Sequence, residues 1–336
     1  MMSVIKELLL WLLFILVIVG GLFTYYARTP IPLEHTPFEF SLKQGSSLKS
    51  TAHQIQQAGG LNNEWLFVLL ARGLRKANQI KPGNYQLEHE VTPLQLLNMI
   101  SKGQFEHSSL TIIEGTTFKE LRVTLNAEST LRHDSSTLTE AEILKRIGAT
   151  ETAAEGLFFP DTYNYSTGSS DLIVLKRAYQ LMQRNLEDNW KKRDSDLPFN
   201  TPYEALILAS IVEKETGQPG DRPMIASVFI NRLKKNMRLQ TDPTVIYGMG
   251  DKFDGNLRKR DLTRDTPYNT YTRNGLTPTP IALPGLAALQ ATLHPAPSHA
   301  LYFVARGDGS SQFSSTLIEH NNAVNQYQIK PFKQKK

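Results

Sequence analysis

The sequence predicts an α+β protein with three parts: a single N-terminal transmembrane helix, a small α+β module and a larger α+β domain. Three observations lead to this fold class. A long apolar run begins at Leu8, strand-like alternation is interspersed with amphipathic helix patterns further on, and Gly103 closes one mixed unit before a new strand pattern begins at Leu110. A chain of 336 residues is long enough for two domains with cores of their own.

The apolar run predicts a transmembrane helix over residues 8–27. About 20 helical residues cross the ~30 Å hydrocarbon layer, and Trp11 and Tyr25 suit its two interfaces. A signal peptide cleaved after Gly21 is the alternative, although its apolar core is usually shorter, about 7–15 residues. We therefore expect a single-pass protein of the cytoplasmic (inner) membrane, with residues 1–7 as a cytoplasmic head and the body in the periplasm or outside.

Residues 28–37 contain three prolines and predict an extended linker. The small module is then expected over residues 38–104. Its strands are expected at 38–42 and 85–87, and its helices over 48–58, from Asn62 or Asn63 through Leu74, and over 93–100. Ser46 and Lys49 match the S-x-x-K pattern of some serine enzymes, but no partner motif occurs, so helix capping explains the serine better.

The larger domain is expected over residues 105–336. Its expected helices cover 117–125, 135–147, 170–190, 203–216, 223–235, 286–293 and 321–327, and its expected strands cover 110–113, 301–305 and 312–314. The segments 155–165 and 238–285 are rich in turn residues and predict irregular structure.

Composition excludes several kinds of function. The absence of cysteine excludes disulfides, thiolate metal sites and cysteine nucleophiles. A net charge of +5 is small and spread along the chain, which argues against nucleic acid as a partner. The chain carries no H-E-x-x-H, Walker A, G-x-G-x-x-G or G-x-S-x-G motif. Prolines separate His294 from His299 and prevent a helical metal pair, so we expect neither a metal nor a cofactor.

One carboxylic acid stands out as a candidate for catalysis. Glu213 follows the segment 205–212, which is apolar on several faces and predicts a buried helix. A carboxyl at the end of such a helix is partly withdrawn from water, as a general acid needs to be. Lys214 and Glu215 leave the helix by other faces. The alternative is that all three residues form a solvated helix end.

Two later segments could line a groove for a sugar polymer. Residues 238–247 and 268–271 supply amides, hydroxyls and aromatic rings, which are the groups that stack on sugar faces and bond to sugar hydroxyls. The alternative is that these segments are ordinary loops of turn residues.

Eight motifs occur in an order that points to one family. They are EGLFFPDTY (155–163), ASIVEKET (209–216), VFINRL (228–233), MRLQTDPTVIYG (237–248), YNTY (268–271), GLTPTPIALPG (275–285), HPA (294–296) and LYFVA (301–305). With them the sequence closely resembles the endolytic murein transglycosylases, the YceG-like or MltG family. The resemblance covers nearly the whole chain and implies a LysM-like module over 38–104, its weaker part, and a YceG-like catalytic domain over 105–336.

The resemblance also implies an activity and a site. The family cleaves the β-1,4 bond between N-acetylmuramic acid and N-acetylglucosamine in peptidoglycan glycan strands without water and leaves 1,6-anhydro ends. It makes Glu213 the catalytic residue, first as general acid and then as base. We expect the side chains of five other residues to position the substrate, or alternatively to hold the loops together: Tyr163, Gln240, Asp242, Asn269 and Tyr271. From the family we further expect cleavage of nascent strands near the membrane, which would end their elongation. We also expect peptidoglycan synthases as partners.

Two other functions compete with this one. An anchored scaffold would bind glycan through the small module and would not need Glu213. A glycoside hydrolase would need a second carboxylate at a defined distance, for which Glu155, Asp161 and Asp242 are available by type.

Overall fold

The computed structural model describes residues 2–33, 38–87, 90–103 and 107–329 of the chain. The chain forms two compact units. One unit comprises residues 1–109 with 164–169, and the other comprises 110–163 with 170–336. Both contain helices and short strands, so the predicted α+β class is confirmed.

The first unit consists of helices packed around one strand pair. Its elements are α1 (Met2–Arg28), β1 (Phe38–Leu42), α2 (Leu48–Gln57), α3 (Glu64–Gly73), β2 (Gly83–Leu87) and α4 (Pro93–Lys102). β1 and β2 are antiparallel with Phe40 opposite Tyr85, and the two rings stack with their centroids 5.3 Å apart. Phe67 and Leu96 lie in the same core. The predicted helix starts are confirmed, because Ser47 caps α2 within the S-x-x-K pattern.

The N-terminal helix α1 carries many exposed apolar side chains. Trp11 and Leu16 are among them. Within the described ranges, however, no helix is sufficiently long and apolar to cross a membrane, and the span predicted over residues 8–27 is not found.

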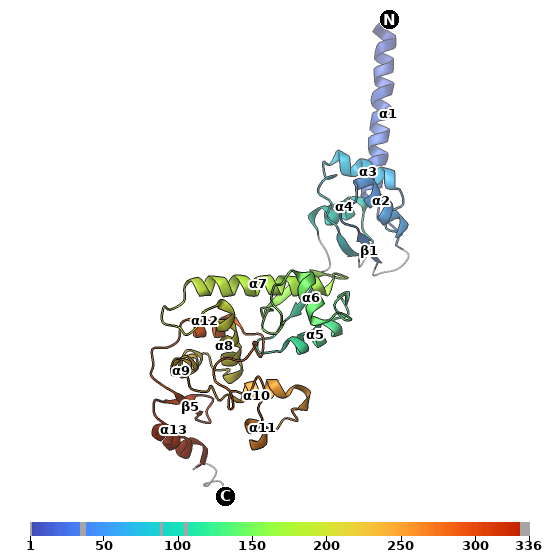
Figure 1. Ribbon diagram of the computed structural model, residues 1–336. Coiled ribbons are helices and arrows are strands. Elements are labelled where there is room, and N and C mark those ends of the chain that lie inside the picture. Colours follow the sequence, from blue (N-terminus) through green and yellow to red (C-terminus); the bar gives the residue numbers. More distant parts are fainter. Residues whose placement is uncertain (1, 34–37, 88–89, 104–106, 330–336) are drawn as a thin grey trace. The chain divides into compact units, whose positions relative to one another are not determined.

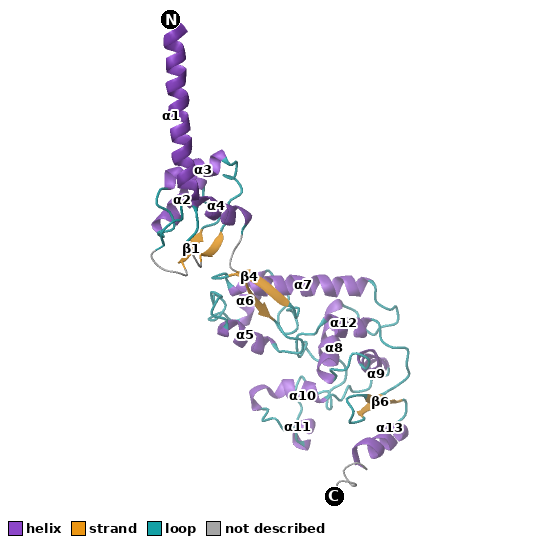
Figure 2. Ribbon diagram, turned by 180° about the vertical axis from the view of Figure 1, so that it is seen from behind, coloured by secondary structure: helices purple, strands orange, loops and turns teal. Residues whose placement is uncertain are grey.

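The second unit is built around a central buried helix. Its helices are α5 (Phe118–Ala127), α6 (Glu140–Ile147), α7 (Asp171–Lys191), α8 (Pro202–Glu215), α9 (Arg222–Lys234), α10 (Asp242–Met249), a 3-10 turn (Gly250–Lys252), α11 (Lys259–Thr263), α12 (Leu286–Leu293), α13 (Leu317–Val324) and a π-helical turn (Asn325–Ile329). α8 packs against α7, α9, α10 and α12, and it lies among them in Figures 1 and 2. All eight residues from Ala205 to Val212 are buried, which confirms the buried helix predicted from their apolar character.

Two further strand pairs complete the fold. β3 (His107–Thr111) pairs with β4 (Thr162–Ser166), and β5 (Tyr302–Ala305) pairs with β6 (Ser311–Ser314). The second pair is antiparallel with Tyr302 opposite Ser314, and its strands agree with those expected over 301–305 and 312–314.

Several predicted elements differ from the structure in detail. α6 begins at Glu140 rather than 135, β3 covers 107–111 rather than 110–113, and α11 lies in a segment expected to be irregular. β4 was expected to be irregular, but Tyr163 and Tyr165 alternate into the core, as strand side chains do. α10 was also expected to be a turn region, yet a proline in its first turn favours a helix start there. α13 begins at Leu317 rather than 321, because Thr316 and Glu319 form a capping box.

Candidate active site

Glu213 lies in the last turn of the most buried helix of the second unit. Thr201 caps the start of α8 and Pro202 occupies its first turn, so the helix has a defined beginning. The apolar residues 205–212 then bury the helix on all sides. The Glu213 side chain is only 6% exposed. The predicted candidate is therefore a partly enclosed carboxyl rather than part of a solvated helix end.

Two donors hold the two oxygens of this carboxylate. The Arg222 guanidinium at the start of α9 donates from Nη2 to Glu213 Oε1 at 3.3 Å. The backbone N–H of Gly285, just before α12, donates to Glu213 Oε2 at 3.0 Å. Both donors are largely enclosed, since the Arg222 side chain is 12% exposed and Gly285 is buried. The carboxylate is thus fixed in position by two neighbouring elements, and its negative charge is compensated.

A second carboxylate adjoins the same glycine. A Cβ atom on Gly285 would lie 1.9 Å from Oε1 of Glu114, so the Glu114 side chain rests directly on the glycine. The Glu114 segment is fastened there by backbone hydrogen bonds from Gly115 N to Leu283 O, at 2.9 Å, and from Leu283 N to Thr116 O, at 2.7 Å. Glu114 itself is exposed. The site therefore has one enclosed and one exposed carboxylate.

Glu215 faces a different part of the domain. It accepts a hydrogen bond from the hydroxyl of Thr241, just before α10. Burial is the largest influence on its pKa and raises it; nearby Asp242 also raises it, while Arg232 opposes the shift. Glu215 thus ties the end of α8 to the start of α10, in agreement with the expectation that it points away from Glu213.

Three of the residues expected to position substrate come together near the start of α10. The Tyr271 hydroxyl donates to Asp242 Oδ1 at 2.6 Å, and Gln240 N donates to Thr270 O at 3.2 Å. Gln240 is exposed and has a φ of 53°, in the left-handed region. Burial raises the pKa of the Tyr271 phenol, and the neighbouring Asp242 adds to this. These side chains form one polar group at the surface.

The other two expected substrate residues use their polar atoms inside the protein. Asn269 is fully buried; its Nδ2 donates to the carbonyls of Asp261, Leu262 and Arg264, and its Oδ1 accepts from Tyr271 N. Tyr163 is 7% exposed and donates its hydroxyl to Phe159 O at 2.6 Å. These bonds suit the alternative of holding the loops together, and substrate contact by all five residues stays a prediction.

A third carboxyl is buried beside a separate cavity. Glu155 accepts from Phe118 N at 2.9 Å and from the Tyr247 hydroxyl at 3.1 Å. Burial raises the pKa of Glu155 to about 7, against the opposing effect of these two hydrogen bonds. The cavity has a volume of about 340 Å³ and is lined by Arg122 and Tyr268 among others. Among the described residues, no hydrogen bond joins Glu155 to Glu213.

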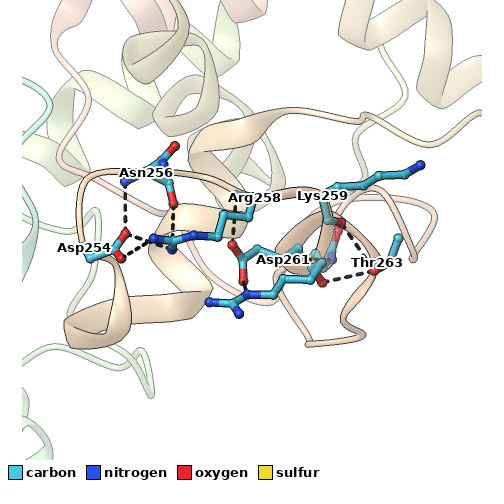
Figure 3. Close-up of polar contacts among 8 residues, drawn as sticks. Asp254, Asn256, Arg258, Lys259, Asp261 and Thr263 are labelled. Carbon is cyan, nitrogen blue, oxygen red and sulfur yellow. Dashed lines mark hydrogen bonds and ion pairs between the residues drawn. The ribbon is translucent and has the colours of Figure 1, made fainter.

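The segment between α10 and Thr266 encloses a basic cavity of about 400 Å³. Arg258 makes a two-pronged ion pair with Asp254, with N–O distances of 3.1 and 2.7 Å, and also donates to Asn256 O (Figure 3). Asp261 accepts from Arg258 N at 2.9 Å and anchors the start of α11. Across the described ranges, no cluster of three histidine or acidic side chains could hold a metal ion.

Sequence reasoning missed the immediate partners of Glu213. Gly285 ends one of the quoted motifs, and a glycine at that point was the available signal. Arg222 lies between two of the motifs, and Glu114 precedes a glycine at the end of a predicted strand. Neither position has a sequence feature that would select it as a site residue. Arg222 is 9 residues and Gly285 is 72 residues from Glu213 along the chain. Gly115, which follows Glu114, is 99 residues from Lys214, whose Nζ it binds through its carbonyl. Only the fold brings these segments together.

Comparisons with known proteins agree on one family. The profile of the YceG-like family matches residues 40–326. An endolytic murein transglycosylase of Bacillus subtilis (strain 168) is 31% identical over 333 residues, which cover 92% of this chain and 91% of that protein. One from Streptococcus pneumoniae serotype 2 is 26% identical, over 91% of this chain and 62% of the longer relative.

A solved structure adds the same result for the fold. The 2.6 Å crystal structure of a putative yceG-like protein from Listeria monocytogenes aligns with a TM-score of 0.54 and 29% identity, and it covers 84% of this chain and 97% of that one. The profile match alone extends over far more than half of the sequence. The chain belongs to the YceG-like family.

Proposed function

We propose that the chain is an endolytic murein transglycosylase, a lyase that cleaves peptidoglycan glycan strands with Glu213 as its single acid and base. One observation carries the proposal: the Glu213 carboxylate ends the buried helix α8, is 6% exposed and is fixed at both oxygens by Arg222 and Gly285. The named relatives support the reaction class.

In the first step, a protonated Glu213 gives its proton to the oxygen that bridges N-acetylmuramic acid and N-acetylglucosamine. The glycosidic bond breaks, and positive charge develops at C1 of the muramyl ring. Glu213 is now a carboxylate, which is the form that the Arg222 guanidinium and the Gly285 N–H stabilise.

In the second step, the carboxylate takes the proton of the C6 hydroxyl of the same sugar. The C6 oxygen bonds to C1, and the product is a 1,6-anhydro end. The proton that left Glu213 is replaced, so no water is consumed and the residue returns to its starting form. A position fixed by two donors suits a group that must act twice on neighbouring atoms.

The second carboxylate favours one rival, a glycoside hydrolase. Glu114 adjoins Gly285, whose N–H holds Glu213, and a retaining or inverting hydrolase needs two acidic groups across the scissile bond. The two reactions give different products, because hydrolysis leaves a reducing end that is heavier by one water.

The test is a digest of purified glycan strands by the full chain, followed by mass analysis. We expect products lighter by one water, and their loss by at least about 100-fold in Glu213→Gln, the scale of a general acid's contribution. Glu187→Gln is the matched control, since Glu187 is 64% exposed on α7, and it should keep full activity. Products with reducing ends would favour the hydrolase. If the Glu213→Gln variant kept full activity, Glu213 would not be the catalytic residue, and the glycan-binding scaffold would be the remaining alternative.

We also propose a location at the outer side of the cytoplasmic membrane, where peptidoglycan lies, and an action on nascent strands beside peptidoglycan synthases that ends their elongation. The exposed apolar side chains of α1, such as Leu13 and Leu16, support membrane association. Fractionation of cells tests the location, and a chain found only in the soluble fraction contradicts it. The LysM-like character of the module at 38–104 also stays a proposal from the sequence.

A further inference from the structure

A third cavity adjoins Arg222, the residue that pairs with Glu213. Its volume is about 480 Å³, and it opens between the end of α7, the start of α9 and α12. The polar groups in its wall include Lys192, Arg222, Gln290 and His294. Figure 1 shows the same three helices around α8. One wall of this cavity is therefore formed by the residue that holds Glu213.

The described wall of the cavity contains cations and no acidic side chain. The two cations are Lys192 and Arg222, and Arg222 also pairs with Glu213, which is not part of the wall. Lys192 is exposed and makes no ion pair within the described ranges. His294 has its own acidic partner, since its Nδ1 lies 2.9 Å from Asp194. By contrast, two acids line the basic cavity near α11 and partly neutralise it.

Arg222 also has unused hydrogen-bonding capacity. Its Nη2 donates to Glu213, but its Nε is buried and has no partner among the described atoms. A buried N–H without an acceptor destabilises the fold, and a guanidinium has five donors arranged to bind carboxylates in pairs. Besides the Nη2 bond to Glu213, the guanidinium therefore has donors that no described group uses, and Arg222 is part of the cavity wall.

We propose that this cavity binds a carboxylate of the substrate, with Arg222 and Lys192 as its cationic contacts and the side-chain amide of Gln290 as a hydrogen-bond donor. The inference rests on the proposed function, because murein carries such carboxylates on its peptide stems and on those lactyl groups from which the stem has been removed. A carboxylate held by Arg222 places the muramyl residue that bears it next to Glu213. The cavity thereby distinguishes murein from uncharged glycans.

The experiment compares Lys192→Gln with Lys191→Gln in the full chain. The two substitutions remove the same charge from adjacent positions, but Lys191 is 69% exposed, contacts Glu187 and Asp188, and is not part of the cavity wall. Three labelled glycans are used: strands with peptide stems, strands stripped by an amidase so that lactyl carboxylates are exposed, and stripped strands whose carboxylates have been converted to carboxamides. Binding is measured by fluorescence anisotropy, and anhydro ends by mass analysis.

The proposal predicts that the wild-type chain binds a carboxylate-bearing strand at least about 10-fold more tightly than the carboxamide strand, the scale of one charge-assisted contact. Lys192→Gln should lose most of that preference, whereas Lys191→Gln should keep it. A preference for stem-bearing or for stripped strands identifies which carboxylate is bound.

Equal binding of all three strands, or equal effects of the two lysine substitutions, overturns the proposal. Failure of the proposed function gives a different result, namely no anhydro ends from any strand by the wild-type chain. The anisotropy measurement does not depend on cleavage, so it decides on the cavity in that case as well.

Discussion

At the scale of single residues, Gly285 has the most demanding position in the site. Its N–H holds Glu213, and its Cα is covered by the Glu114 carboxylate. Its φ of −79° is accessible to any residue, so the glycine is required by the space around it and not by its backbone conformation. A side chain here would compete with Glu114 for the same volume.

We expect Gly285→Ala to reduce cleavage strongly with little loss of stability. The new Cβ would meet Glu114 Oε1 at 1.9 Å and Cδ at 2.3 Å. Because these atoms end a flexible side chain, relief costs only about 1 kcal/mol of unfolding free energy, whereas a misplacement of the Glu213 donor by a fraction of an ångström lowers activity by roughly 10- to 100-fold. Gly220→Ala, with nothing within 4 Å of its Cβ position, is the control for both urea unfolding and glycan cleavage. Equal activity of the two variants would contradict the expectation.

Glu155 gives a pH dependence to stability. Its pKa rises on folding from 4.5 to about 7 because the carboxyl is buried. Between these two values the folded chain binds more protons at Glu155 than the unfolded chain, so the unfolding free energy decreases as the pH rises through this interval. The contribution is present in full below pH 4.5, and it amounts to about 3 kcal/mol.

We therefore expect Glu155→Gln to flatten the stability profile between pH 4.5 and about 7. The amide oxygen can accept from Phe118 N as the carboxylate does, so the fold is retained. Urea unfolding at several pH values measures the profile, with the exposed Glu187→Gln as control. If the unfolding free energy of Glu155→Gln still decreased with pH as steeply as that of the wild-type chain, another group would be responsible for the pH dependence.

At the scale of elements, the sequence predicts α8 well and its partners poorly. Apolar residues on all faces identify a buried helix from local information alone. The segment 275–285 that lies against it has no periodic pattern, and its position depends on contacts such as Ile281 N to Ser210 Oγ, 71 residues apart, at 2.9 Å. Contacts between distant, irregular segments leave no periodic signal, and for this reason the donors of Glu213 were missed.

Ser210→Ala tests that connection. Ser210 is fully buried, and its hydroxyl accepts from Ile281 N while it donates to Ile207 O. Its removal leaves a buried N–H unpaired, and we expect the unfolding free energy to fall by about 1–3 kcal/mol. Ser195→Ala, at an exposed position, should change it by less than about 0.5 kcal/mol. Matching unfolding curves for both variants would show that the bond does not support the loop.

At the scale of the whole molecule, composition and motif order predict the mixed fold and the family, both of which are confirmed. The N-terminal span was predicted from length and apolarity and is not found in the described ranges. Contacts divide the chain at residues 109 and 110, and residues 164–169 join the first unit. No local sequence pattern predicts that residues 164–169 belong to the first unit, because their position depends on the pairing of β4 with β3.

Two units with their own cores should unfold separately. Phe67 is fully buried in the first unit and Phe229 is 1% exposed in the second, and a Phe→Ala change in a core costs about 3–5 kcal/mol. We expect Phe67→Ala to lower one calorimetric transition of the full chain and Phe229→Ala to lower the other, because distant sites contribute additively. A joint shift of both transitions by either variant would show that the units unfold as one.

The complete burial of residues 205–212 has a consequence for the motions of the enzyme. Backbone amides in the best-packed helix of a domain exchange with deuterium only when the domain opens as a whole. Glu213, the proposed catalytic acid, lies one residue beyond the stretch that we expect to exchange most slowly in the second unit. On the proposed function, the adjustments that admit and release a glycan strand are then expected in the surrounding loops, with α8 fixed.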